Sequence, residues 1–298
     1  MSEHLMKLAL VVALTHGFRT LSTRVGPRWG GLALGLPCST AVALVGSGSE
    51  QGVDYARAMA ETSLLGLVGA VALPLAYARA IGRRWGFPWP PLVAVGAFLA
   101  AASLAGVLAP PGSGSGVPFA LMAVLSATAL AGRIAIPEAS RRVQVALGHP
   151  ARTWAIRTMV PAACLMASLL LGRAFGPGVA GLMSTFPGLT LTVLLLTHLE
   201  AGPGAVVRLA RTLPPANLGM VAFLGSFHWG IARFGLSGGT GLAYLASIAA
   251  LAFVAWFADV ESRPALRRTG RGRSALPDLH PWPKSGRQFS PLVERLAA

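Results

Sequence analysis

The sequence predicts an all-α polytopic membrane protein with about nine transmembrane helices, arranged as two inverted four-helix repeats joined by one linking helix. Composition is the first observation, because 54% of the 298 residues are hydrophobic and only 12% are charged. Soluble domains have about 25% charged residues. The other two observations are a set of long apolar stretches and a segment of the chain that recurs further along it.

Nine stretches are long and apolar enough to cross a bilayer, which takes about 20 mostly apolar residues, or slightly fewer where flanking residues reach the interface. They lie at about 5–21, 30–48, 63–81, 91–109, 118–136, 154–171, 179–197, 217–232 and 241–258. The first is the weakest, and a cleaved signal peptide is its alternative interpretation. A retained helix is favoured because no small-residue cleavage site follows, and because its counterpart at 154–171 lies in mid-chain.

The recurrent segment marks an internal duplication of roughly a hundred residues. Residues 26–52 align with 176–202 without a gap at an offset of 150, and the register continues beyond them. Shared hydrophobicity does not explain the match, since the identical positions include glycine, proline and glutamate. Identical pairs within the aligned segments are Gly26/Gly176, Pro27/Pro177, Gly31/Gly181, Leu32/Leu182, Pro37/Pro187, Thr40/Thr190, Leu44/Leu194, Glu50/Glu200 and Gly52/Gly202.

Helix counting gives the second copy the opposite orientation. Four helices return the chain to its starting side, so the single additional crossing at 118–136 inverts the second copy. The predicted divisions are a first repeat at 1–110, a linking region at 111–153, a second repeat at 154–260 and a basic, disordered tail at 261–298.

Arginine residues support this topology, because basic loops face the cytoplasm. The prediction is an amino terminus outside and a carboxyl terminus inside a bacterial inner membrane. The formal net charge of +15 then reflects topology and the tail, where anionic lipid headgroups are the expected partner and nucleic acid is not. Arginines on the predicted inner face are Arg19, Arg24, Arg28, Arg79, Arg83, Arg84, Arg133, Arg141, Arg142, Arg152, Arg208 and Arg211.

Pro37 and Pro187 are the candidate substrate-path residues, together with Thr40 and Thr190 three positions on. A proline within a helix frees backbone carbonyl groups, which polar side chains must pair again in a membrane. Paired proline interruptions in matching helices indicate the central site of a transporter. A simple kink that shapes helix packing is the alternative.

Glu50 and Glu200 are the acidic residues that recur between the copies. In an inverted pair they would lie at opposite mouths of the path, where each could act as a gate or an ion-coupling group. The alternative is a solvated helix end.

Catalytic and metal-binding patterns do not emerge from the sequence, so we expect no enzyme activity, no cofactor and no metal. No His-Glu-x-x-His or aspartate-rich motif is present. Cys38 and Cys164 are interpreted as packing residues, and His228 as a structural histidine.

The segment RVGPRWGGLALGLP, followed by EQG and a further apolar helix, resembles the small four-helix GlpM-type bacterial inner-membrane proteins. This resemblance covers about a third of the chain, and the second copy departs from it where Gly30 becomes Ala180 and Leu36 becomes Phe186. It implies a fused, inverted pair of such units and assigns no catalytic residue.

The leading functional prediction is a transporter or exporter of a small solute, with its path between the two copies. A non-transporting scaffold or assembly subunit is the second hypothesis, and a membrane-embedded enzyme is a weaker third. The sequence is compatible with a homo-oligomer and does not identify the solute.

Overall fold

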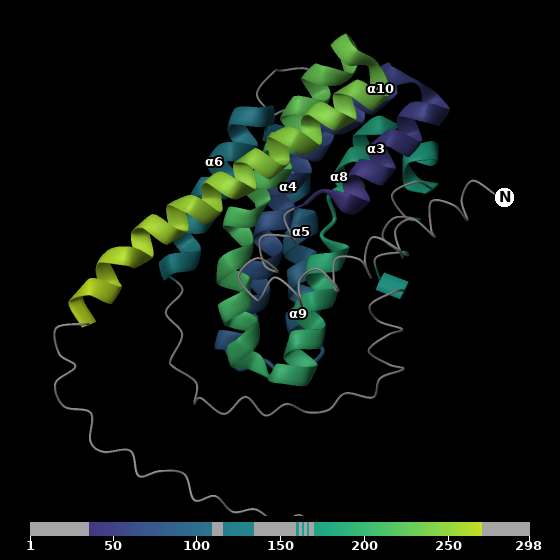
Figure 1. Ribbon diagram of the computed structural model, residues 1–298. Coiled ribbons are helices and arrows are strands. Elements are labelled where there is room, and N and C mark those ends of the chain that lie inside the picture. The colour runs from purple at the N-terminus through teal and green to yellow at the C-terminus, as the bar shows by residue number, and fades with distance from the viewer. Residues whose placement is uncertain are drawn as a thin grey trace, which may run out of the picture. The chain divides into compact units, whose positions relative to one another are not determined.

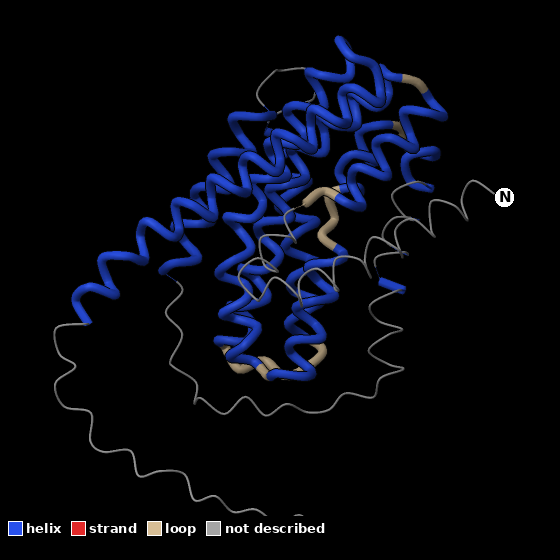
Figure 2. The backbone as a smooth tube through the Cα atoms, in the orientation of Figure 1, coloured by secondary structure: helices blue, strands red, loops and turns tan. Residues whose placement is uncertain are grey.

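A computed structural model describes residues 36–108, 116–133 and 170–269, with isolated positions between 159 and 166. Within these ranges every element is a helix and no strand is present, and only short turns separate neighbouring helices (Figures 1 and 2). The helices are α3 (Cys38–Gln51), α4 (Val53–Gly82), α5 (Trp89–Leu108), α6 (Gly116–Arg133), α8 (Pro177–Ser184), α9 (Gly188–Ala201) and α10 (Pro203–Thr269).

Four segments of the described chain are long and apolar enough to cross a membrane: Val53–Gly82, Trp89–Leu108, Pro177–Leu199 and Pro203–Trp256. The coarse prediction of an all-helical chain with membrane-spanning helices is therefore confirmed. A shorter apolar helix, Val117–Thr128, lies in the predicted linking stretch.

The apolar stretch predicted at 63–81 lies inside α4, which begins ten residues earlier, at Val53. Its first turns are polar, and Asp54 lies in the first turn, where a carboxylate interacts favourably with the helix dipole. Hydropathy alone misses such a polar beginning.

The stretches predicted at 217–232 and 241–258 lie on either side of Gly235, where two helices that share the label α10 meet at a kink. The first begins at Pro203, and the direction changes at Gly235, whose φ of +67° is outside the helical region. The 54 residues of Pro203–Trp256 would extend about 80 Å as a straight helix, enough for two crossings. Gly235 permits this turn without a loop, because glycine lacks the Cβ that penalises positive φ.

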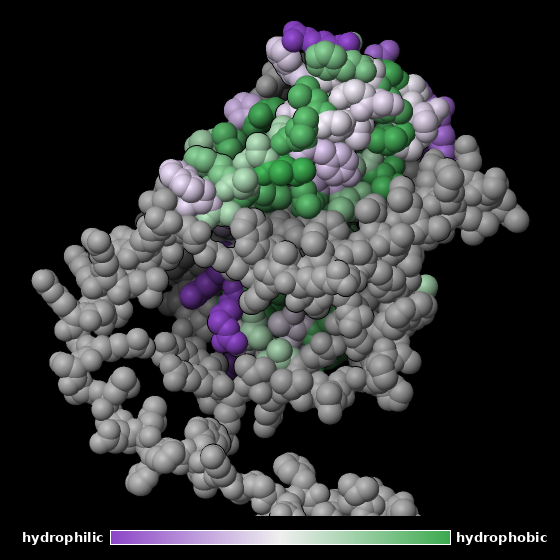
Figure 3. All heavy atoms as spheres, viewed as in Figure 1, coloured by the Kyte–Doolittle hydropathy of each residue, from purple (hydrophilic) through white to green (hydrophobic). Residues whose placement is uncertain are grey.

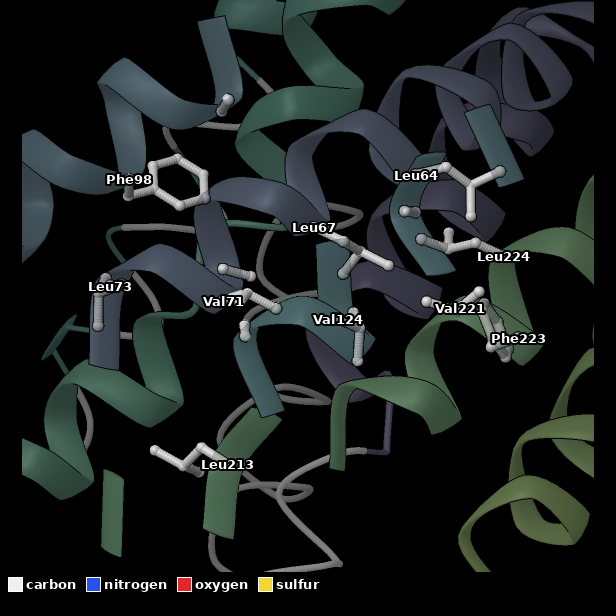
Figure 4. Close-up of a cluster of buried hydrophobic side chains, with 14 of the residues drawn as sticks. Leu64, Leu67, Val71, Leu73, Phe98, Val124, Leu213, Val221, Phe223 and Leu224 are labelled. Carbon is white, nitrogen blue, oxygen red and sulfur yellow. The ribbon is translucent and has the colours of Figure 1, made fainter. Parts of the chain in front are cut away.

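The hydrophobic core is built around α4. Leu64, Leu67 and Val71 of this helix are almost fully buried. The close-up shows them among side chains from the helices that surround α4 (Figure 4). Those side chains include Phe98 of α5, Val124 of α6, and Val221, Phe223 and Leu224 of α10.

Contacts along α4 give the direction of its neighbours. The Thr62 hydroxyl reaches the carbonyl oxygen of Pro177 at 3.1 Å, while Tyr77, further along α4, bonds His198 at 3.1 Å. The α8–α9 segment therefore runs parallel to α4. Conversely, α3 folds back on α4 through the single residue Gly52 (Figure 1).

The corresponding glycines Gly52 and Gly202 consequently lie at opposite ends of α4. Gly202 joins α9 to α10 close to the His198–Tyr77 contact, at the end of α4. At the other end, the ring nitrogen Nδ1 of His228 in α10 lies 3.3 Å from the carbonyl oxygen of Arg57. The turn at Gly52, between α3 and α4, and the turn at Gly202, between α9 and α10, therefore face opposite directions along α4.

Apolar side chains remain on the outer faces of α5 and α10. Leu92 and Leu104 of α5, and Leu245 and Phe253 of α10, are more than half exposed. In the space-filling view, hydrophobic atoms dominate the upper described surface and hydrophilic atoms gather at its rim (Figure 3). These faces suit a lipid environment, because exposing this much apolar surface to water is unfavourable.

A substitution at Gly69 tests how closely α4 and α5 pack. A Cβ at this position would lie 2.6 Å from the Phe98 carbonyl oxygen and 3.0 Å from the Ala102 Cβ. Gly69→Ala should therefore destabilise the protein by about 1–3 kcal/mol, measured as a lower thermal unfolding midpoint in detergent. The control is Gly96→Ala on α5, where nothing lies within 4 Å. Equal midpoints for both variants would contradict this packing.

Candidate functional site

Pro37 and Pro187 form the same local structure, although they lie 150 residues apart. Their backbone angles are φ −80°, ψ 54° and φ −82°, ψ 62°. In each case the following residue's N–H donates to the preceding residue's carbonyl, at 2.9 Å around Pro37 and 2.8 Å around Pro187. These angles and this bond define an inverse γ-turn. Proline favours the turn because its ring holds φ near −65°.

The prediction that these prolines interrupt their helices in mid-span, with a simple kink as the alternative, is corrected in one respect: neither proline lies inside a helix. Each proline immediately precedes a new helix, α3 or α9, and its own carbonyl accepts that helix's first hydrogen bond at 2.8 Å. Before Pro187, α8 has already ended at Ser184. The γ-turn diverts the backbone, so the membrane segment Pro177–Leu199 is a broken helix and not a kinked one.

The end of α8 leaves its last four carbonyl groups without partners inside the helix. Two of them find donors within the break itself. The Thr185 hydroxyl donates to the Leu182 carbonyl at 2.9 Å, and the Phe186 N–H donates to the Met183 carbonyl at 3.0 Å.

The other two carbonyls are paired by hydroxyl groups that include side chains from α3 and α4. Thr40 of α3 donates to the Ser184 carbonyl at 2.9 Å. Ser63 of α4 contacts the Gly181 carbonyl at 3.1 Å, and the Ser184 hydroxyl lies 2.9 Å from the same oxygen. Thr40 and Ser63 are at most 1% exposed. The break is therefore sealed by side chains from helices more than a hundred residues away in sequence.

Three hydroxyl groups form a compact set that we call the hydroxyl cluster: Thr62 and Ser63 of α4, and Ser184 of α8. The Ser63 and Ser184 oxygens are 2.9 Å apart. Thr62 lies 3.1 Å from the carbonyl oxygens of both Met59 and Pro177. All three side chains are at most 5% exposed.

Glycine allows α8 to approach α4 closely enough for these bonds. A Cβ on Gly181 would overlap the Thr62 hydroxyl and the Met59 carbonyl oxygen. A Cβ on Gly66 would overlap the Thr185 hydroxyl and lie 3.3 Å from the Leu182 Cα. Small residues bring membrane helices together in this way.

Of the predicted path residues, Thr40 lies at the break, and Thr190 occupies the matching third position of α9, half-buried. The structure thus brings Thr40, Pro187 and the end of α8 together. Pro37 lies at the start of α3, two residues before Ser39 and three before Thr40.

Glu50 lies in the last turn of α3 and forms an ion pair with Arg173 at 3.0 Å. The Tyr55 hydroxyl, just beyond, donates to the Gly172 carbonyl at 3.0 Å. These bonds connect Gly172 and Arg173 to the α3–α4 turn. The backbone of Glu200 occupies the corresponding last turn of α9, and its side chain lies outside what the structure describes.

Several predictions fall outside the described residues. They concern the helix at 5–21, most of the helix at 154–171 with Cys164, and the tail from residue 270 onward. Cys38 is buried at the start of α3. Among the described residues, no group of His, Cys, Asp and Glu is arranged to hold a metal ion.

Sequence reasoning missed Ser63, Thr62 and Ser184 as site residues. A signal was present in the spacing of small residues along α4, where Thr62, Ser63, Gly66 and Gly69 interrupt an apolar run. Such spacing indicates a close helix contact. Thr62 also matches Thr212, whose hydroxyl donates to the Leu209 carbonyl at 2.9 Å, as Thr62 does to Met59.

Comparison of the chain with family models, curated proteins and solved structures finds no match. The resemblance to GlpM-type proteins therefore stays a prediction, and the site must be interpreted from its own geometry.

Thr40→Val should leave the Ser184 carbonyl unpaired in a buried place, which costs about 1–3 kcal/mol. The expected result is a lower thermal unfolding midpoint, with Thr40→Ser close to wild type because it keeps the hydroxyl. Thr128→Val is the matched control, since the Thr128 hydroxyl bonds the Val124 carbonyl of its own helix α6, at 2.8 Å. Equal unfolding midpoints for the two valine variants would show that the bond from Thr40 to Ser184 does not stabilise the fold.

Proposed function

We propose that this protein is a bacterial inner-membrane transporter or exporter of a small solute, with its path at the broken helix between two inverted copies. The observation that carries the proposal is the break at Thr185–Pro187, inside a segment long and apolar enough to cross a membrane. Irregular backbone at membrane depth is tolerated where it is buried in protein or lines a cavity. Discontinuous helices of this kind form the central sites of many transporters.

The inverted arrangement has support from the corresponding elements. Helices α3 and α9 share their bounds at an offset of 150, from Cys38–Gln51 to Gly188–Ala201. Each is followed by one glycine of positive φ, +96° at Gly52 and +77° at Gly202. Relative to α4, α3 is antiparallel and α9 parallel, which is the relation that inversion requires.

The break would also be the moving part. Its hydroxyl bonds connect the first copy to the second, so a change in the angle between the copies would exchange these partners. Glu50 and Arg173 lie away from the break at the α3–α4 turn, where their ion pair would close one mouth of the path. Glu200 would serve the opposite mouth.

A non-transporting scaffold is the second candidate. The pairing of all four terminal carbonyls of α8 favours it, because a fully satisfied joint can be purely structural. The two candidates differ in whether a solute crosses the membrane.

Transport should be measured with the purified protein in liposomes, against a panel of solutes, with and without a pH gradient. We expect uptake of at least one solute, slowed in Pro187→Ala, Glu50→Gln and Glu200→Gln. Pro91→Ala, in the first turn of α5, is the matched proline control and should transport as wild type. No movement of any solute, or wild-type rates in all three site variants, would favour the scaffold.

The topology is tested separately with reporter fusions. A fusion after Ser113 should read periplasmic and one after Arg273 cytoplasmic, because an inverted pair with an outside amino terminus places them so. A cytoplasmic signal at Ser113 would refute the inverted arrangement.

A further inference from the structure

The α4–α5 turn, residues 83–88, exposes large aromatic side chains between two apolar helices. It joins Val53–Gly82 to Trp89–Leu108, and each of these segments is long and apolar enough to cross a membrane. The turn therefore lies where the bilayer meets water. Trp85, Phe87 and Trp89 are 43%, 54% and 60% exposed. Tryptophan is enriched at this depth, because its ring is apolar and its N–H is polar.

Three arginines accompany these aromatic residues. Arg79 lies in the last turn of α4, and Arg83 and Arg84 follow the last residue of that helix. All three side chains are exposed. The guanidinium carbon of Arg83 lies 5.9 Å from the centre of the Trp85 ring, within the range of a cation–π contact. The turn thus places positive charge directly beside apolar rings.

Arg84 occupies a backbone position that is typical of glycine. Its φ is +58°, in the left-handed region that residues with a Cβ rarely adopt. The Arg84 N–H donates to the Ile81 carbonyl at 2.8 Å. The Trp85 N–H donates to the Ala80 carbonyl at 3.2 Å. These two bonds form a Schellman motif, whose left-handed residue is usually glycine.

A role in ending the helix explains Arg79 and does not explain Arg84. A cation in the last turn of a helix interacts favourably with the helix dipole, and Arg79 is placed to do so. At the position of Arg84, glycine would end the helix without backbone strain. Strained residues cluster where a protein binds a ligand. The positive charge of Arg84 therefore indicates an anionic ligand.

Positive charge also predominates in the neighbouring elements. Arg208 and Arg211 lie in the first turns of α10, which begins at this end of α4, and Glu200 lies in the last turn of α9 nearby. An anionic partner would complement the excess of arginine. The other acidic residues with described side chains lie in α3 or in the first half of α4: Glu50, Asp54 and Glu61.

An apolar stripe leads from the turn along α5. Trp89, Leu92, Gly96 and Leu99 are all exposed. Their spacing of three or four residues places them on one face of the helix. An acyl chain would lie along this stripe, whereas a small soluble anion would make no contact with it. The stripe therefore favours a lipid as the anionic ligand.

We propose that the α4–α5 turn binds the headgroup of an anionic phospholipid. Arg83 and Arg84 would contact the phosphodiester, because a guanidinium offers paired N–H donors to phosphate oxygens. Trp85 and Trp89 would lie beside the headgroup, and an acyl chain would follow the stripe of α5. This binding surface is separate from the broken helix and does not depend on a solute path.

The test is thermal unfolding of the full-length protein in detergent, titrated with phosphatidylglycerol, phosphatidylcholine or inorganic phosphate. A ligand that binds only the folded state raises the unfolding midpoint as its concentration rises. We expect a rise with phosphatidylglycerol and not with the other two. Arg84→Gly should weaken the apparent affinity for phosphatidylglycerol about fivefold. Its midpoint without lipid should stay close to that of the wild type, since glycine adopts positive φ readily.

Arg83→Gln is the second site variant and should weaken the affinity by a similar factor. Arg57→Gln is the matched control, because Arg57 is an exposed arginine near the opposite end of α4, and it should keep the full response. Equal responses to phosphatidylglycerol and phosphatidylcholine, or to phosphatidylglycerol and inorganic phosphate, would overturn the proposal. Site variants that respond like Arg57→Gln would also overturn it. If Arg84→Gly does not fold, Arg83→Gln decides.

Discussion

The pairing of the carbonyl groups at the end of α8 is the constraint on which the site depends. A helix that stops inside a bilayer exposes polar backbone where no water can bond it, and each unpaired group costs several kcal/mol. Here Thr40 of α3 pairs the Ser184 carbonyl, and Ser63 of α4 adds a donor to the Gly181 carbonyl, which the Ser184 hydroxyl also reaches. The break can exist only while these helices lie beside it, so local backbone geometry and helix packing stabilise each other.

The proline turns explain why the break occurs where it does. At Pro37 and Pro187 the same φ, ψ and turn bond begin helices of equal bounds at the 150-residue offset. What differs is direction relative to α4, since α3 folds back on α4 and α9 runs parallel to it. A motif that recurs at an offset of 150 residues therefore forms the same local structure twice, and α4 with its glycines at 66 and 69 is a surface against which neighbouring helices pack.

The sequence was sufficient for the features that depend on local chemistry. Stretches predicted at 91–109 and 118–136 agree closely with α5 and α6, because hydropathy fixes the extent of an apolar helix. Hydropathy did not show that polar residues extend α4 back to Val53, or that two helices meet at Gly235 without a loop between them. Thr40 was recognised as a partner for freed carbonyls, but Ser63 and Ser184 were not. Their bond joins positions 121 residues apart, and periodicity carries no information about such a distance.

The packing of the break on α4 is tested most directly by a double-mutant cycle on Gly66 and Thr185. A Cβ at Gly66 would overlap the Thr185 hydroxyl, so the two substitutions Gly66→Ala and Thr185→Ala should be strongly coupled. We predict that Gly66→Ala clearly lowers the unfolding free energy of the wild type and has little effect in the Thr185→Ala background. An equal loss in both backgrounds would show that Thr185 does not lie against Gly66, and would contradict a broken helix seated on α4.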